Sequence, residues 1–147
     1  MSAITETNLV TSDEFVTDLL CALSLQSVTK VTLSDTMTDV RFENAFKDLL
    51  NARDEFNVDV DFSLAVNPYH GDSSTLRETL YGLRERGVVS INNPSFKTVT
   101  INVDNEDAEH FLKRSSLPRT FIDRVVRARF ADGSTAVEHV NGRADAT

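Results

Sequence analysis

The clearest pattern of apolar and polar positions lies between Asp72 and Val103. Leu76, Leu80 and Leu83 recur at the three- and four-residue spacing that places side chains on one face of a helix. Gly87 follows one turn later, where glycine most easily adopts the left-handed conformation that ends many helices. The pattern therefore predicts a helix that ends at this glycine.

The start of this helix and the segment after it also carry local signals. Thr75-Leu76-Arg77-Glu78 fits a capping box, and Asp72 and Ser73 are rival N-caps. Beyond the helix, Val88–Ile91 and Thr98–Val103 flank a loop rich in turn-forming residues, and the second segment alternates apolar with polar side chains. We expect these two segments to form a β-hairpin over about residues 88–103.

The preceding part of the chain predicts helices and strands in alternation. Thr11-Ser12-Asp13-Glu14 fits a capping box, and helical spacing follows to about Ser24. β-branched residues from Val28 to Leu33 favour a short strand. A second apolar stripe predicts a helix from about Thr36 to Glu55. Alternation from Val58 to Leu64 predicts a half-buried strand, with a helix as the alternative, and residues 67–71 predict a loop.

The end of the chain predicts two further helices between polar segments. Asp104–Arg114 has an acidic start and a basic end, which complement the helix dipole. Arg119–Phe130 places apolar residues on one side and arginines on the other, which suits packing on its own domain or docking to a partner. We expect a flexible leader over residues 1–10, one domain over 11–130 and a flexible tail over 131–147, in which Val137 and Val140 could add a brief element.

The helix, its terminal glycine and the hairpin resemble the recognition helix and wing of winged helix-turn-helix proteins. The resemblance depends on Leu-x-x-x-Leu-x-x-Leu-x-x-x-Gly and on Leu-Arg-Glu-Arg-Gly-Val-Val at the junction of helix and strand, and it spans about Asp35 to Val103. The lead-in Tyr69-His70-Gly71-Asp72-Ser73 is loosely similar to small winged-helix proteins of antitoxin type and of multi-component phage-defence systems. The resemblance implies an α+β, winged-helix-like domain with a small antiparallel β-sheet and a C-terminal helical extension.

The charge distribution changes what this fold would be expected to bind. The 147-residue chain has a formal net charge of -8, which argues against a surface that binds phosphates throughout. Residues 1–62 contain 12 acidic and 4 basic side chains, whereas residues 111–130 contain 1 acidic and 6 basic ones. This asymmetry could orient the molecule on a charged partner.

Candidate contact residues lie on the predicted recognition helix, the wing and the basic C-terminal helix. Arginine and lysine would hold phosphates, and aromatic side chains would suit a protein contact. The candidate DNA- or partner-binding residues are Arg77, Tyr81, Arg84, Arg86, Phe96, Lys97, Arg119, Arg124, Arg127 and Arg129. Apolar patches around Tyr81, Phe96 and Phe121 are the places where we expect a protein partner.

Catalytic and membrane functions find little support in the residue pattern. The three histidines are widely separated, and none stands at metal-ligand spacing from cysteine or another histidine. His70 is the only one in a loop that could hold an acid or base, and the single Cys21 lies in an apolar run that favours a buried, unreactive thiol. No apolar run reaches the roughly 20 residues of a membrane span. We expect a cytoplasmic protein that is not an enzyme, with no cofactor, metal or evident small-molecule substrate.

Two functional hypotheses follow. The preferred one is an interaction module, a small subunit or adaptor of a multi-protein complex, whose partner is another protein or a second copy of the chain. The alternative is a sequence-specific transcriptional regulator that binds double-stranded DNA as a homodimer. The predicted recognition helix has few side chains that could read bases, and the net charge of the chain is negative. Both features favour the interaction module.

Overall fold

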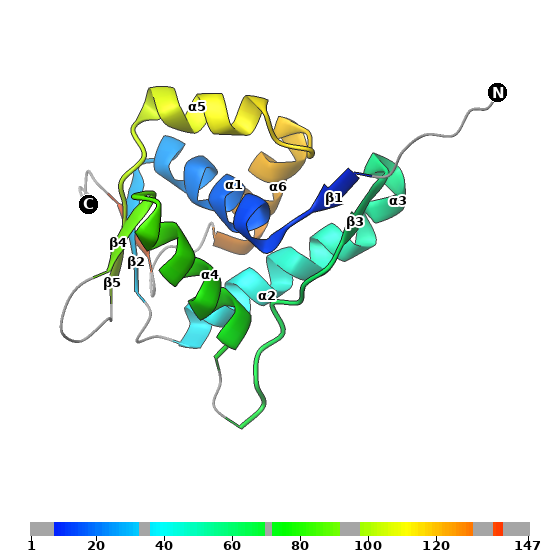
Figure 1. Ribbon diagram of the computed structural model, residues 1–147, viewed down its shortest axis with the longest axis horizontal. Coiled ribbons are helices and arrows are strands. Elements are labelled where there is room, and N and C mark those ends of the chain that lie inside the picture. The colour runs from blue at the N-terminus through cyan, green and yellow to red at the C-terminus, as the bar shows by residue number, and fades with distance from the viewer. Residues whose placement is uncertain (1–7, 33–35, 70–71, 92–97, 131–136, 140–147) are drawn as a thin grey trace.

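The computed structural model describes residues 8–32, 36–69, 72–91, 98–130 and 137–139, which form an α+β protein (Figure 1). The helices in these ranges are α1 (Ser12–Leu25), α2 (Thr36–Asn51), α3 (Arg53–Phe56), α4 (Ser74–Glu85), α5 (Asn105–Lys113) and α6 (Arg119–Phe130). The strands are β1 (Asn8–Val10), β2 (Val28–Thr32), β3 (Val58–Val60), β4 (Val89–Ile91), β5 (Thr98–Ile101) and β6 (Val137–His139).

The predicted hairpin is confirmed and forms half of a four-stranded antiparallel sheet. The strand order is β4-β5-β2-β6, and Val89 of β4 lies opposite Ile101 of β5. Strand β2, from much earlier in the chain, adds to the other side of β5 with Val31 opposite Val99. Because Val31, Val89, Val99 and Ile101 are all buried, the sheet presents one apolar face to the core.

A second, two-stranded parallel sheet corrects the expectation of a flexible leader. Asn8–Val10 forms β1 and pairs with β3, in register from Asn8 with Val58 to Val10 with Val60. Val10 is fully buried, so its apolar side chain anchors the end of the predicted leader in the core. Residues 1–7 lie outside the described part of the chain. The predicted strand to Leu64 is shortened to residues 58–60, although the Leu64 side chain is fully buried.

The prediction of a flexible tail over residues 131–147 is also wrong for one segment. Residues 137–139 form β6, which pairs antiparallel with β2 at the edge of the larger sheet. The brief element expected near Val137 is therefore confirmed, whereas Val140 and the remaining tail residues lie outside the described part of the chain. Strand β2 supplies the backbone partners that a local sequence pattern could not reveal.

Helix boundaries follow the local chemistry with three corrections. The Thr11 hydroxyl accepts a hydrogen bond from the Glu14 backbone N–H at 3.1 Å, but the Glu14 carboxylate accepts from the backbone N–H of Ser116, 102 residues away. The cap of α4 is Ser73, whose hydroxyl accepts from the Leu76 N–H at 3.2 Å, so the predicted Thr75 box does not form the cap. The predicted helix to Glu55 is divided into α2 and the single-turn α3.

Gly87 ends the helix segment as expected. Its φ of 80° lies in the left-handed region, and the next residue, Val88, donates its N–H to the Leu83 carbonyl at 3.0 Å. This turn directs the chain from α4 into β4. A fixed junction of this kind sets the orientation of α4 relative to the sheet.

Helix α1 forms the centre of the core and contacts α4, α5, α6 and β2 (Figure 1). Its residues from Phe15 to Ser24 are all buried. Cys21 is fully buried, and that burial raises the pKa of its thiol to about 12, so the prediction of a buried thiol is confirmed. Within the described ranges, no helix combines the length and apolar character needed to cross a membrane.

Helix α6 packs on its own domain. Its apolar side is buried against α1 and α2, and the buried residues are Phe121, Ile122, Val125, Val126 and Phe130. The Phe130 ring meets the Phe42 ring of α2 edge to face, with centroids 5.1 Å apart. The predicted basic helix therefore has its apolar side in the core, and its arginines lie on the outer side.

Candidate interaction surface

Helix α4 presents a narrow exposed stripe opposite its buried face. Ser74, Glu78, Tyr81 and Glu85 are the exposed positions, and their spacing of four, three and four residues keeps them on one side of the helix. The buried positions are Leu76, Thr79, Leu80 and Leu83. The α4 stripe, as we call these four exposed residues, therefore carries two carboxylates and an aromatic ring, and no basic side chain.

Arg77 lies beside the stripe and is directed into the protein. Its guanidinium donates a hydrogen bond to Asp39 of α2 at 2.8 Å, and only 22% of its side chain is exposed. The Asp39 side chain is fully buried, and that burial raises the pKa of its carboxyl, an effect that the hydrogen bond from Arg77 opposes. This predicted site residue thus ties α4 to α2.

The other two arginines of the predicted recognition segment also contact carboxylates. The Arg84 guanidinium lies 5.6 Å from the centroid of the Tyr81 ring and 3.7 Å from the Glu85 carboxylate. Arg86 lies 3.2 Å from the carboxylate of Asp13 on α1. Each of these neighbouring negative charges lowers the positive potential that a phosphate would encounter.

The second predicted set, on α6, does not form one basic patch. Arg129 makes two hydrogen bonds with Asp48 of α2, at 2.8 and 2.7 Å, and these bonds raise the pKa of its guanidinium. Arg119 donates to Glu109 at 2.6 Å and to Asp123 at 3.3 Å. Two of the four predicted arginines are therefore engaged in pairs within the domain.

The remaining two arginines of α6 lie at its surface. Arg124 is exposed, with its guanidinium 5.5 Å from the centroid of the Phe121 ring. Arg127 is also exposed. In the described ranges, neither makes an ion pair with a carboxylate. Of the four predicted arginines of α6, these two are therefore the ones available for an external anion.

The aromatic residues among the predicted contacts also differ in whether they are exposed or buried. Tyr81 is 39% exposed, as a contact residue requires. Phe121 is buried and packs on the Phe56 ring at 5.1 Å, so the predicted exposed patch around it is wrong. Its place in the i, i+1, i+4, i+5 apolar pattern of α6 already indicated a core side chain. Phe96, Lys97 and His70 lie outside the described residues.

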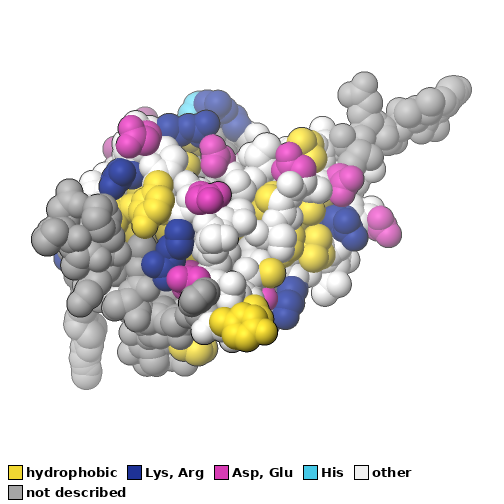
Figure 2. Space-filling view, turned by 60° about the horizontal axis from the view of Figure 1, so that its bottom comes forward, with side chains coloured by type: hydrophobic (Ala, Val, Ile, Leu, Met, Phe, Trp, Pro, Cys, Tyr) yellow, Lys and Arg dark blue, Asp and Glu magenta, His cyan; other side chains and the backbone are white. Residues whose placement is uncertain are grey.

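Exposed Tyr69 and Met37 were not among the predicted contact residues. Tyr69 is 91% exposed and Met37 is 46% exposed. Figure 2 shows the face at the bottom of Figure 1, where apolar side chains occur in separate groups and basic and acidic side chains are interspersed. A surface of mixed charge with exposed aromatic rings is typical of protein contacts rather than of a phosphate-binding face.

Metal binding has no geometric support in the described ranges, where no three His, Cys, Asp or Glu side chains gather as a metal site would require. No protein-family model, curated protein or solved structure matches this chain. The contacts described above are therefore the basis for any functional conclusion.

Proposed function

We propose that this chain is a non-enzymatic winged-helix interaction module, a small subunit or adaptor of a multi-protein complex, and that it contacts another protein through the α4 stripe. The observation that carries the proposal is the composition of that stripe. Glu78, Tyr81 and Glu85 face solvent, whereas Arg77, Arg84 and Arg86 each lie within 4 Å of a carboxylate.

The order of the elements supports the winged-helix part of the proposal. A helix, a strand and two further helices of several turns precede the hairpin, in the order α1, β2, α2, α4, β4 and β5. The first strand, β2, pairs with the second hairpin strand, β5, to give the order β4-β5-β2. In this comparison α4 corresponds to the recognition helix and β4–β5 to the wing, with α3 and β3 inserted between α2 and α4.

Charge and side-chain chemistry favour a protein partner over DNA. A helix in the major groove needs donors for base edges and cations for phosphates, and carboxylates at Glu78 and Glu85 would instead face the phosphate charges. Tyrosine offers an apolar ring and a polar hydroxyl, and it is enriched among residues that dominate protein interfaces. Tyr81, held beside the Arg84 guanidinium, is such an anchor.

Site-specific cross-linking in cells of the native host tests this proposal. A photoreactive amino acid would replace Tyr81 in one sample and Phe111, an exposed aromatic residue of α5, in a matched control. We expect a discrete cross-linked protein from position 81 that is absent from position 111, and loss of that protein from co-purification with Tyr81→Ala. Equal labelling from both positions would contradict the proposed surface.

DNA binding as a homodimer is the second candidate function, and the exposed Arg124 and Arg127 favour it. It predicts affinity for duplex DNA that falls steeply with salt concentration, and a loss of affinity when Arg84 and Arg86 are both changed to alanine. Unchanged DNA affinity in that double variant would exclude α4 as the DNA contact.

A further inference from the structure

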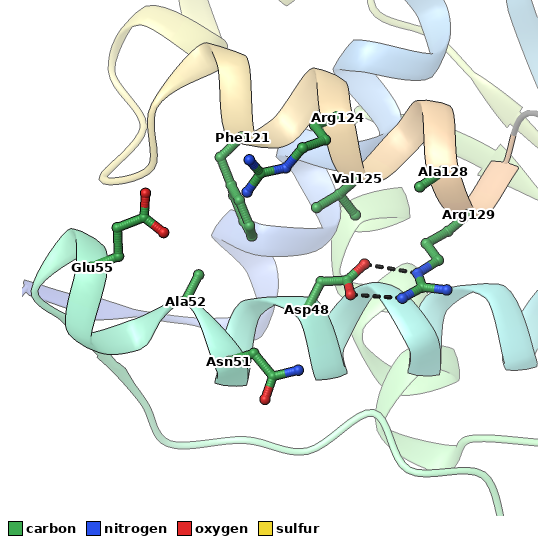
Figure 3. A pocket seen from close by; sticks show the side chains of 9 residues that line it. All are labelled: Asp48, Asn51, Ala52, Glu55, Phe121, Arg124, Val125, Ala128 and Arg129. Carbon is green, nitrogen blue, oxygen red and sulfur yellow. Dashed lines mark hydrogen bonds and ion pairs between the residues drawn. The ribbon is translucent and has the colours of Figure 1, made fainter.

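A groove separate from the α4 stripe lies between α6 and the end of α2 with α3 (Figure 3). Its volume is about 310 Å³, at the small end of the range for ligand sites. Its lining includes Asp48, Glu55, Phe121, Arg124, Val125 and Arg129. The groove therefore combines apolar side chains with several charged ones.

The apolar part of the groove is formed mainly by buried side chains. Ala52, between α2 and α3, and Phe121 and Val125 of α6 are buried core residues that reach the groove with one surface. The bidentate Arg129–Asp48 pair spans from α6 to α2 at one end (Figure 3). Because these two charges satisfy each other, that end acts as a wall rather than as a binding group.

The other end of the groove carries two opposite charges. Glu55 projects from α3 and Arg124 from α6, and in Figure 3 the Phe121 side chain stands between them, away from the Arg129–Asp48 pair. Both side chains are exposed, and no ion pair joins them or links either to another described residue. The Phe121 ring holds the Arg124 guanidinium at 5.5 Å, which limits its freedom before any ligand binds.

We propose that this groove binds a small zwitterion of the amino-acid class. The ligand carboxylate accepts hydrogen bonds from Arg124, and its ammonium donates to Glu55. An apolar side chain then lies against Phe121, Val125 and Ala128. A small ligand that carries both charges is favoured because each of its charged groups meets an opposite charge in the groove, whereas an acid alone would meet the like charge of Glu55 and an amine alone that of Arg124.

Titration of the full chain with three related molecules tests the proposal. Leucine carries both charges, 4-methylpentanoate lacks the ammonium, and isopentylamine lacks the carboxylate. Amide chemical shifts report binding site by site. We expect leucine to shift the signals of Ala52, Val125 and Ala128, and each single-charge analogue to bind at least about tenfold more weakly. Absence of shifts with leucine, or equal binding of either analogue, would overturn the proposal.

Charge variants assign the two contacts. Arg124→Gln and Glu55→Gln should each weaken leucine binding at least about tenfold, since each removes one charge-assisted hydrogen bond. Arg127→Gln is the matched control, because Arg127 is an exposed arginine of the same helix that does not line the groove. A thermal unfolding curve for each variant verifies that the fold is kept. Equal loss of affinity in the Arg127 variant would show a general effect of charge and refute the assignment.

Discussion

Replacement of Asp18 by asparagine should stabilise this protein at neutral and alkaline pH. Asp18 lies on the central helix α1 with only 2% of its surface exposed, and its carboxylate accepts a hydrogen bond from the Ser115 hydroxyl at 2.5 Å. Burial raises the pKa of Asp18 from 3.8 to about 7. The hydrogen bond from Ser115 opposes this shift, and the nearby charge of Glu14 adds to it. Between about pH 4 and pH 7, the Asp18 carboxyl therefore stays protonated in the folded protein and is ionised in the unfolded chain.

The sign and size of the effect follow from this difference in pKa. Because the folded-state pKa is the higher one, proton uptake at Asp18 favours the folded state fully below about pH 4. That contribution is lost as the pH rises to about 7. The difference between a pKa of 3.8 in the unfolded chain and about 7 in the folded protein corresponds to a loss on the order of 4 kcal/mol in the free energy of unfolding.

Asparagine at position 18 keeps the shape of the side chain and its carbonyl acceptor for Ser115, but has no charge to bury. We expect Asp18→Asn to be more stable than the parent by about 2 to 4 kcal/mol at pH 8, and the two to converge toward pH 4. The lower figure allows for an imperfectly paired amide group.

Urea unfolding at several pH values between 4 and 8 measures this difference. Asp13→Asn is a suitable control, since it removes a carboxylate from the same helix at a more exposed position, where Asp13 pairs with Arg86. A constant difference between parent and Asp18→Asn across this pH range would refute the reasoning, as would the same pH-dependent gain in the control.

Four further substitutions test the local structure around α4, each by urea unfolding at pH 7. Asp39→Ala should destabilise the fold by about 2 to 4 kcal/mol, because Arg77 loses a buried partner; an effect under about 1 kcal/mol would contradict this. Ser73→Ala should cost about 1 kcal/mol through loss of the cap and Thr75→Ala clearly less, so the reverse order would contradict the cap assignment. Gly87→Ala should cost about 1 kcal/mol from its φ of 80° alone, since a Cβ there meets nothing within 4 Å, and a gain in stability would refute this.

The predicted candidate site was only partly readable from the sequence. Outward positions of α4 could be inferred from its leucine spacing, and Tyr81 is indeed exposed. The state of the arginines could not be inferred. Arg77 meets Asp39 across 38 residues of sequence, and Arg129 meets Asp48 across 81. No local pattern links residues so far apart, and these contacts decide which cations face solvent.

The sequence by itself determined the features that depend on a few neighbouring residues. The Thr11 cap acts across three residues, Gly87 acts through its own backbone, and the alternation around Val99 reflects the two faces of one strand. The apolar stripe of residues 119–130 likewise predicted a buried face. These signals are local because capping, backbone strain and side-chain periodicity act within a turn or a strand.

Only the tertiary structure decided which distant segments pair. Strand β1 becomes ordered through a partner, β3, about 50 residues later, and β2 joins both β5 and β6. The same long-range packing placed Glu55 and Arg124 on opposite walls of one groove. Such contacts depend on how whole elements bury their apolar faces together, and therefore on the complete core rather than on any single stretch of sequence.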